Sequence, residues 1–79
     1  MKNYYCEGKV EYIFTDEEGE CTLTEIYELI FECKNKKDAK IAAKVKIAEM
    51  FDSEIGGDGI TNVKIIIDDL YETSSDARF

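Results

Sequence analysis

Carboxylates are the side chains most able to do chemistry in this 79-residue sequence, which has 18 Asp and Glu, 10 Lys and Arg, and no histidine. Histidine is the usual general base and a common zinc ligand, so a cysteine nucleophile or a catalytic metal would lack its ordinary partner. The adjacent acids Asp68 and Asp69 would point to opposite faces of a strand and could not work as an acid–base pair. We therefore expect a protein that is not an enzyme and whose acids act through their charge.

Two short stretches resemble ligand-binding loops but do not meet the requirements of such loops. The segment "GGDG", residues 56–59, follows an expected helix, whereas a phosphate-cradling loop precedes one. The segment "DSEIGGDG" spaces its acids loosely like a calcium loop, but position five would be Gly56 and position twelve Val63. We expect neither a metal nor another cofactor.

The three cysteines, Cys6, Cys21 and Cys33, are odd in number and widely spaced, which suits neither a disulfide framework nor a two-plus-two metal site. Reduced thiols are the simplest interpretation. No apolar run approaches the roughly 18 residues that cross a bilayer, and the N-terminal segment has no apolar signal core. These features predict a cytoplasmic protein that does not enter a membrane.

Residues 4–14 alternate in polarity, which is typical of a strand with one buried and one exposed face. The apolar or small set, expected to be buried, is Tyr4, Cys6, Gly8, Val10, Tyr12 and Phe14. The opposite set is Tyr5, Glu7, Lys9, Glu11 and Ile13. Gly19, in the segment "TDEEGE" that follows, suits a hairpin loop because glycine readily adopts a positive φ.

The second extended stretch, residues 21–33, has about the same length but is less regular. Leu23 and Tyr27 share one parity, into which Glu25 intrudes, so a β-bulge near Thr24 and Glu25 is expected to shift the alternation. The rival interpretation is a helix over "TEIYELIF". Its β-branched and aromatic residues favour the strand.

A helix of about 16 to 18 residues is expected next. Asn35 is a good N-cap with Asp38 three residues on, and "KKDAKIAAKVKIAEMF" is rich in alanine and lysine. Gly56 and Gly57 would end it. The alternating segment "ITNVKIIIDDLYE", residues 60–72, predicts a third strand.

The element order predicts an α+β fold, a two-layer β-β-α-β sandwich. Its three-stranded antiparallel sheet would have the order 2-1-3, with the helix packed on one face. Residues 1–73 would form a single domain and residues 74–79 a flexible C-terminal tail.

Positive charge is concentrated in residues 34–46, "KNKKDAKIAAKVK", which we call the lysine segment. It carries +5 while the rest of the chain carries −13, in agreement with the net charge of −8. Such a segment can be a solvated helix surface, or it can meet acidic groups of its own chain or of a second copy. Direct nucleic-acid binding is not expected, because the surrounding negative field repels phosphate.

The acids are expected on the sheet face that the helix leaves uncovered. On the three strands these are Glu7, Glu11, Glu28, Glu32 and Asp68, and in the first turn Asp16, Glu17, Glu18 and Glu20. Same-face residues of one strand lie roughly 6.6 Å apart. This is about twice the 3.4 Å rise per phosphate of a DNA strand. The nine acids are predicted to bind a basic protein surface, the alternative being that they are simply solvated.

The helix has two apolar stripes, only one of which can face the sheet directly. One stripe contains Ile41, Val45 and Ala48. The other contains Ala39, Ala43, Ile47 and Met50, and these four residues are a candidate homodimer interface. Uncovered sheet edges also favour self-association.

The size, acidity and element order of the whole chain resemble those of small phage proteins that block bacterial defence, notably the anti-CRISPR proteins. The resemblance rests on "KVEYIFTDEEGECTLTEIYELIFEC", "KNKKDAKIAAKVKIAEMF" and "NVKIIIDD". It implies a phage-encoded stoichiometric inhibitor in the bacterial cytoplasm, which occupies a basic nucleic-acid channel of a CRISPR effector and excludes DNA or guide RNA. The lysine segment departs from the wholly acidic surface of a nucleic-acid mimic, and no motif residue carries over.

Two hypotheses follow. The leading one is a non-enzymatic acidic binding protein that occupies a basic nucleic-acid-binding surface of a CRISPR effector or another nucleic-acid-handling complex. The alternative is a small homodimeric structural or assembly module whose acids serve only solubility.

Overall fold

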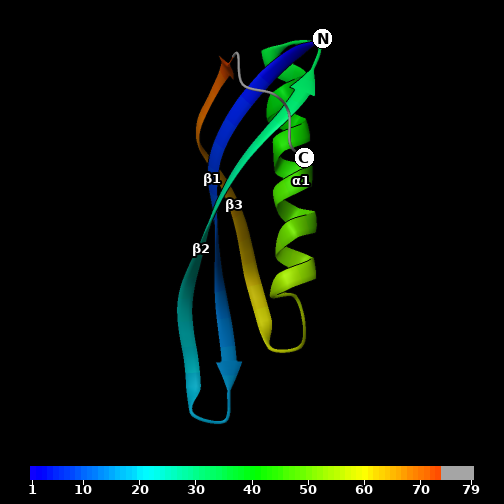
Figure 1. Ribbon diagram of the computed structural model, residues 1–79. Coiled ribbons are helices and arrows are strands. Elements are labelled where there is room, and N and C mark those ends of the chain that lie inside the picture. The colour runs from blue at the N-terminus through cyan, green and yellow to red at the C-terminus, as the bar shows by residue number, and fades with distance from the viewer. Residues whose placement is uncertain (74–79) are drawn as a thin grey trace.

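The computed structural model describes residues 1–73, which form three long strands and one helix. The elements are β1 (Lys2–Asp16), β2 (Gly19–Cys33), α1 (Lys36–Glu54) and β3 (Ile60–Thr73). The strands form an antiparallel sheet in the order β2-β1-β3, and α1 lies along one face of it (Figure 1). The predicted α+β, β-β-α-β fold and strand order are confirmed. The expected tail, residues 74–79, lies outside the described residues.

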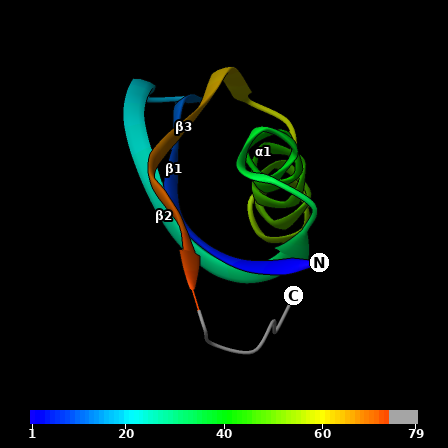
Figure 2. The same ribbon diagram turned by 90° about the horizontal axis from the view of Figure 1, so that it is seen from above.

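The sheet curves around α1, so that its concave face and the helix enclose the core (Figure 2). The alternation of β1 is confirmed, since Tyr4, Cys6 and Val10 are buried on the helix side. Gly8 lies on the same side, where an added Cβ would come within 2.8 Å of Cδ1 of Ile47 and 2.9 Å of the Ile66 carbonyl oxygen. The missing side chain at Gly8 therefore lets α1 approach the sheet.

β2 is a strand throughout, so the rival helix over "TEIYELIF" is wrong. The bulge expected near Thr24 and Glu25 is also wrong, because the β1–β2 register runs without a break from Lys2↔Cys33 to Asp16↔Gly19. The irregular polarity has another cause. The end of the β1–β2 hairpin extends beyond α1 (Figure 1), so Leu23 lies on the helix side of β2 and is still exposed.

The irregularities lie in β3 instead. The β1–β3 register shifts between Glu7 and Gly8, and again between Glu11 and Ile13. At the first shift Asp69 is opposite Glu7 and Ile67 is opposite Gly8, which leaves Asp68 as the additional residue. A bulge of this kind changes the face to which the following residues point.

The helix begins as predicted. The Asn35 side-chain oxygen accepts a hydrogen bond of 2.9 Å from the backbone N–H of Asp38, so the cap satisfies one of the free amides of the first turn. The helix ends at Glu54, directly before the cap residue Ile55 and Gly56. Its 19 residues slightly exceed the expected length.

The assignment of the two helix stripes is reversed relative to the prediction. Ala39, Ala43 and Ile47 are fully buried against the sheet, Met50 is partly buried, and Phe51 completes the buried stripe. The candidate homodimer interface of Ala39, Ala43, Ile47 and Met50 is therefore wrong, because these side chains belong to the core of the single chain. The second stripe is the exposed one, with Ile41 61% and Val45 52% exposed.

Candidate protein-binding surface on the open sheet face

We call the sheet face away from α1 the open face. Its side chains form rows across the three strands, because residues directly opposite in an antiparallel register point to the same side. In one row Glu7 of β1 lies between Glu28 of β2 and Asp69 of β3. We call these three residues the acidic row. Neighbouring Cβ atoms in such a row are about 4.5–5.5 Å apart.

Among residues 1–73 the acidic row has no cationic partner. The ion pairs of this part of the chain are Lys9–Asp68, with 3.8 Å between Nζ and Oδ1, and Lys2–Glu72, also 3.8 Å. Both involve acids outside the row. Like charges directly opposite one another destabilise a sheet. A cationic ligand would offset the like charges of the row.

Two tyrosines border the acidic row. Tyr5 and Tyr71 lie opposite each other with ring centroids 5.0 Å apart, and Ile30 completes their row on β2. The Tyr5 hydroxyl donates a hydrogen bond of 3.3 Å to Oε2 of Glu7. Burial raises the pKa of the Tyr5 hydroxyl, and the charges of Glu28 and Glu7 raise it further. Tyr5 thus stays protonated and keeps Glu7 in place.

On its other side the acidic row borders a row of Ile26, Lys9 and Ile66. Ile26 is 71% exposed and adds an apolar side chain to this row. The open face therefore combines a line of negative charge with apolar and aromatic side chains on both sides. Aromatic residues such as tyrosine are enriched at protein interfaces, and the polar groups of an interface lie mainly at its rim.

The other predicted strand acids lie on or near this face. Glu11 lies one row beyond Lys9, directly opposite Lys64, and Glu32 lies opposite Asn3 near the far end of the sheet. Asp68, expected on the open face by simple alternation, sits in the bulge and pairs with Lys9. Asp69, which simple alternation would place on the opposite face, lies beside Glu7 instead.

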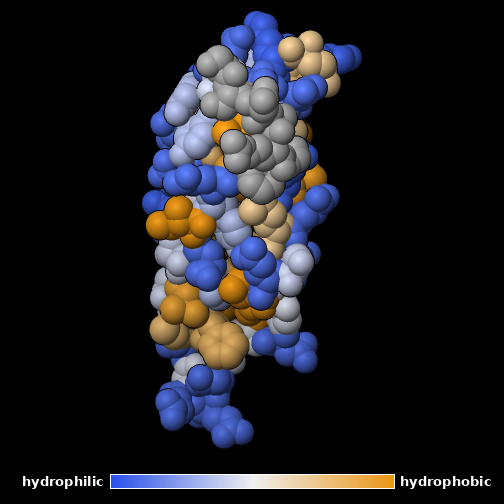
Figure 3. All heavy atoms as spheres, viewed as in Figure 1, coloured by the Kyte–Doolittle hydropathy of each residue, from blue (hydrophilic) through white to orange (hydrophobic). Residues whose placement is uncertain are grey.

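The four predicted turn acids are not part of the acidic row. Asp16, Glu17, Glu18 and Glu20 lie at the hairpin end of a molecule 47 Å long. Asp16 is nine residues from Glu7 along β1, a distance of about 30 Å. Figure 3 shows this end, at the bottom of the view, as hydrophilic, whereas apolar patches appear further up. The acids thus form two separate groups.

Sequence reasoning missed the contribution of Asp69, Tyr5 and Tyr71 to this surface. The alternation in β1 correctly placed Tyr5 on the face opposite the buried residues. Its pairing with Tyr71, however, depends on the β1–β3 register. That register contains two shifts, and the sequence "KIIIDDLY" gives no direct sign of their position.

The cysteines do not add a reactive group to the surface. Cys6 is fully buried beneath α1, and burial raises the pKa of its thiol to about 11, with smaller contributions from Asp69 and Asp68. A thiol with this pKa is protonated at neutral pH and is a poor nucleophile. Cys21 is exposed at the hairpin end and Cys33 is partly buried at the opposite end of β2.

Part of the lysine segment compensates acids of its own chain. Lys36 and Lys40 line a hollow of about 300 Å³ together with Asp68, Asp69 and Leu70. This arrangement places two cations near the edge of β3, although none of the segment's lysines forms an ion pair within residues 1–73. Lys37 and Lys44 are exposed on α1 and do not line this hollow.

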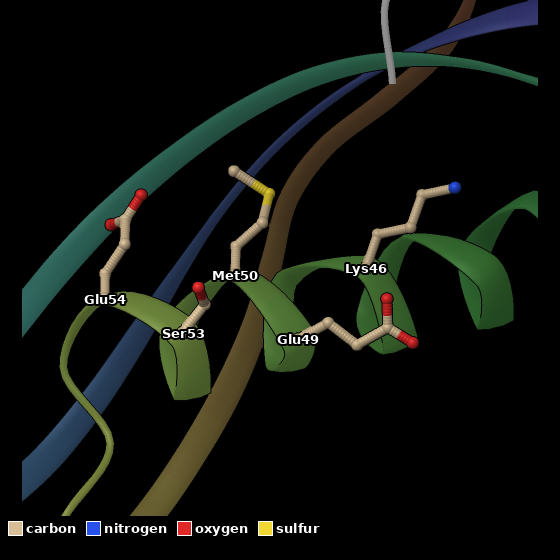
Figure 4. Close-up of a pocket in the computed structure, with 5 residues that line it drawn as sticks. All are labelled: Lys46, Glu49, Met50, Ser53 and Glu54. Atoms are coloured by element: carbon tan, nitrogen blue, oxygen red, sulfur yellow. The ribbon is translucent and has the colours of Figure 1, made fainter.

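A second hollow, of about 360 Å³, lies between α1 and β2. Lys46, Met50 and Glu54 point from the helix toward β2, and the Glu49 side chain runs along the helix (Figure 4). The Lys46 ammonium lies 5.9 Å from the Phe31 ring centroid. These lining charges are mixed in sign, so the hollow is less suited to a charged ligand than the acidic row.

The described residues contain no group of three or more His, Cys, Asp or Glu side chains arranged to hold a metal ion. Within residues 1–73, α1 does not have the combination of length and apolar character needed to cross a bilayer. Comparisons of the chain with protein-family models, with curated proteins and with solved structures found no match.

Proposed function

We propose that this protein is a non-enzymatic binding protein whose open face occupies a basic, nucleic-acid-binding surface of another protein. The observation that carries the proposal is the acidic row, in which Glu28, Glu7 and Asp69 lie side by side and none of the three forms an ion pair within residues 1–73. A fold gains nothing in stability from this arrangement. A basic partner would turn the repulsion into attraction.

The surface offers more than charge. Tyr5, Tyr71 and Ile26 stand next to the acidic row and can exclude water from its ion pairs. Charge complementarity mainly speeds encounter and selects the partner, while desolvated aromatic and aliphatic contacts supply much of the affinity. The open face has both components within three adjacent rows.

Nucleic-acid-binding surfaces are the class of basic surface that fits best. They are built to bind a line of regularly spaced negative charges. The acidic row presents one charge every 5 Å or so across a rigid sheet. The similarity in size, acidity and element order to the anti-CRISPR proteins supports a phage-encoded inhibitor of a CRISPR effector or a related nucleic-acid-handling complex as the specific form of this function.

A displacement experiment tests the proposal. Purified CRISPR effector complexes of the main types, together with restriction endonucleases, are loaded with fluorescent target DNA and titrated with the protein. We expect stoichiometric displacement of DNA from at least one complex. The triple variant Glu7→Gln/Glu28→Gln/Asp69→Asn should compete about ten-fold or more weakly, a loss of about 1.4 kcal/mol or more.

The matched control is Glu17→Gln/Glu18→Gln/Glu20→Gln, which removes three charges from the hairpin end and should keep most of the affinity. Circular dichroism confirms that both variants fold. Failure to displace DNA from every complex would count against the proposal, as would equal competition by the two triple variants.

A further inference from the structure

We propose that the outer face of α1 docks on the open face of a second copy, so that the protein self-associates through its own charge asymmetry. The outer face is the exposed side of the helix, defined by Lys37, Ile41, Lys44 and Val45. This proposal goes beyond the proposed function, because here the open face binds a second copy of the same protein instead of a different one.

The outer face of α1 is an unusual helix surface. Ile41 and Val45 are one turn apart and both are more than half exposed, although the core has room for only the other stripe. Lys37 and Lys44 flank Ile41 on successive turns, and neither forms an ion pair among residues 1–73. Lys37 lies in the first turn, where a cation opposes the macrodipole, so helix stability alone does not explain it.

The open face supplies the complementary features. Its acidic row carries three negative charges, and the neighbouring row carries Ile26 and Ile66 on either side of Lys9, whose ammonium pairs with Asp68. Successive rows of one sheet face are about 6.6 Å apart. At 3.6 residues per turn, Lys37 and Lys44 lie along one side of the outer face, and Ile41 and Val45 lie beside them. A helix laid along the rows can therefore place the two lysines over the acidic row and the two aliphatic side chains over the next row.

The two surfaces lie on opposite sides of the molecule. Figure 2 shows α1 inside the curve of the sheet, so the outer face of the helix and the open face point in opposite directions. A contact between unlike surfaces on opposite sides leaves one free surface at each end, so copies can continue to add instead of stopping at a dimer. The net charge of −8 on each copy opposes this contact at long range. The self-association is therefore weak, and a basic partner that binds the open face displaces the second copy.

Charge-swap variants test the contact by sedimentation velocity over a concentration series. The helix variant is Lys37→Glu/Lys44→Glu, and the sheet variant is Glu7→Lys/Glu28→Lys. We expect the wild type to sediment faster as concentration rises, and each variant to remain monomeric, since each brings like charges together. An equimolar mixture of the two variants should associate again, because both kinds of contact then join opposite charges.

The ionic strength provides a second readout. Raising it shortens the screening length from roughly 30 Å at 0.01 M to roughly 8 Å at 0.15 M. The association constant fitted over the concentration series should differ between these conditions for the wild type, whereas the helix variant should show no association at either ionic strength. Circular dichroism of each variant verifies the fold, and Ile41→Asp is an alternative helix variant if a charge-reversed protein is unfolded.

Three outcomes would overturn this proposal. One is a wild type that remains monomeric at every concentration. Another is a charge-swap mixture that stays dissociated although both variants are folded. The third is a monomeric wild type that binds a fluorescent oligonucleotide through Lys37 and Lys44, which would assign the helix face to phosphate. The helix variant keeps the acidic row intact, so it should still displace DNA from the effector complex. Measuring that displacement therefore separates failure of this proposal from failure of the proposed function.

Discussion

Glu7 occupies the centre of the acidic row, where two carboxylates face it from the neighbouring strands. Its Oε2 accepts a hydrogen bond of 3.3 Å from the Tyr5 hydroxyl in the adjacent row. The placement of Glu7 and Glu28 on the open face could be predicted from the alternation of polarity in β1 and β2. The placement of Asp69 opposite Glu7 could not, because it depends on a bulge whose position is set by the packing of Ile65 and Ile67 under α1.

Neutralising Glu7 should stabilise the isolated protein. We expect Glu7→Gln to raise the free energy of unfolding by about 0.2–1 kcal/mol at low salt, since it removes the like charge facing both neighbours. The gain should shrink as salt screens the repulsion. Urea unfolding at low and high ionic strength measures both effects.

Glu17→Gln at the hairpin end is the control for this substitution and should change stability by less than about 0.5 kcal/mol, as is usual for exposed surface positions. A Glu7→Gln protein that is less stable than the wild type at low salt would show that Glu7 supports the fold. Its role would then be structural, and the repulsion argument would fail.

For α1, the sequence predicted where the helix begins and about how long it is, but not which side of it is buried. The cap at Asn35 and the length of the helix were predictable because capping and propensity are local properties. The sequence could not show which of the two apolar stripes faces the sheet, because Ala39, Ala43 and Ile47 resemble Ile41 and Val45 in total apolar content. The deciding features are Phe51, which extends the buried stripe and packs on Tyr12 with ring centroids 5.0 Å apart, and Gly8, which makes room for Ile47.

A matched pair of substitutions tests this assignment of the stripes. Ile47→Ala should lower the free energy of unfolding by about 2–5 kcal/mol, because it opens a cavity in a fully buried site. Ile41→Ala removes the same atoms from an exposed site and should change it by less than about 0.5 kcal/mol. Thermal and urea unfolding of both variants provide the comparison. Equal destabilisation by the two substitutions would contradict the observed orientation of α1.

At the scale of the whole molecule, charge is divided among three regions: the hairpin end, the open face and the outer face of α1. The overall fold could be predicted because strand, strand, helix, strand allows few compact arrangements. The separation of the acids into two groups could not be predicted, because it follows from the length of the β1–β2 hairpin, which carries residues 16–20 beyond the helix (Figure 1). Under the proposed function, the distant turn acids would speed encounter with a basic partner, whereas the acidic row would contact it.

The most direct measurement is the affinity of the protein for the effector complex from which it displaces DNA, taken over a range of salt concentrations. The wild type, the row variant and the hairpin variant are compared side by side. The row variant is Glu7→Gln/Glu28→Gln/Asp69→Asn and the hairpin variant is Glu17→Gln/Glu18→Gln/Glu20→Gln. We expect wild-type affinity to fall steadily as salt rises, the row variant to bind weakly with a much reduced salt dependence, and the hairpin variant to lose mainly association rate. An affinity that is independent of salt, or a row variant that binds as tightly as the wild type at every ionic strength, would contradict recognition through the open face.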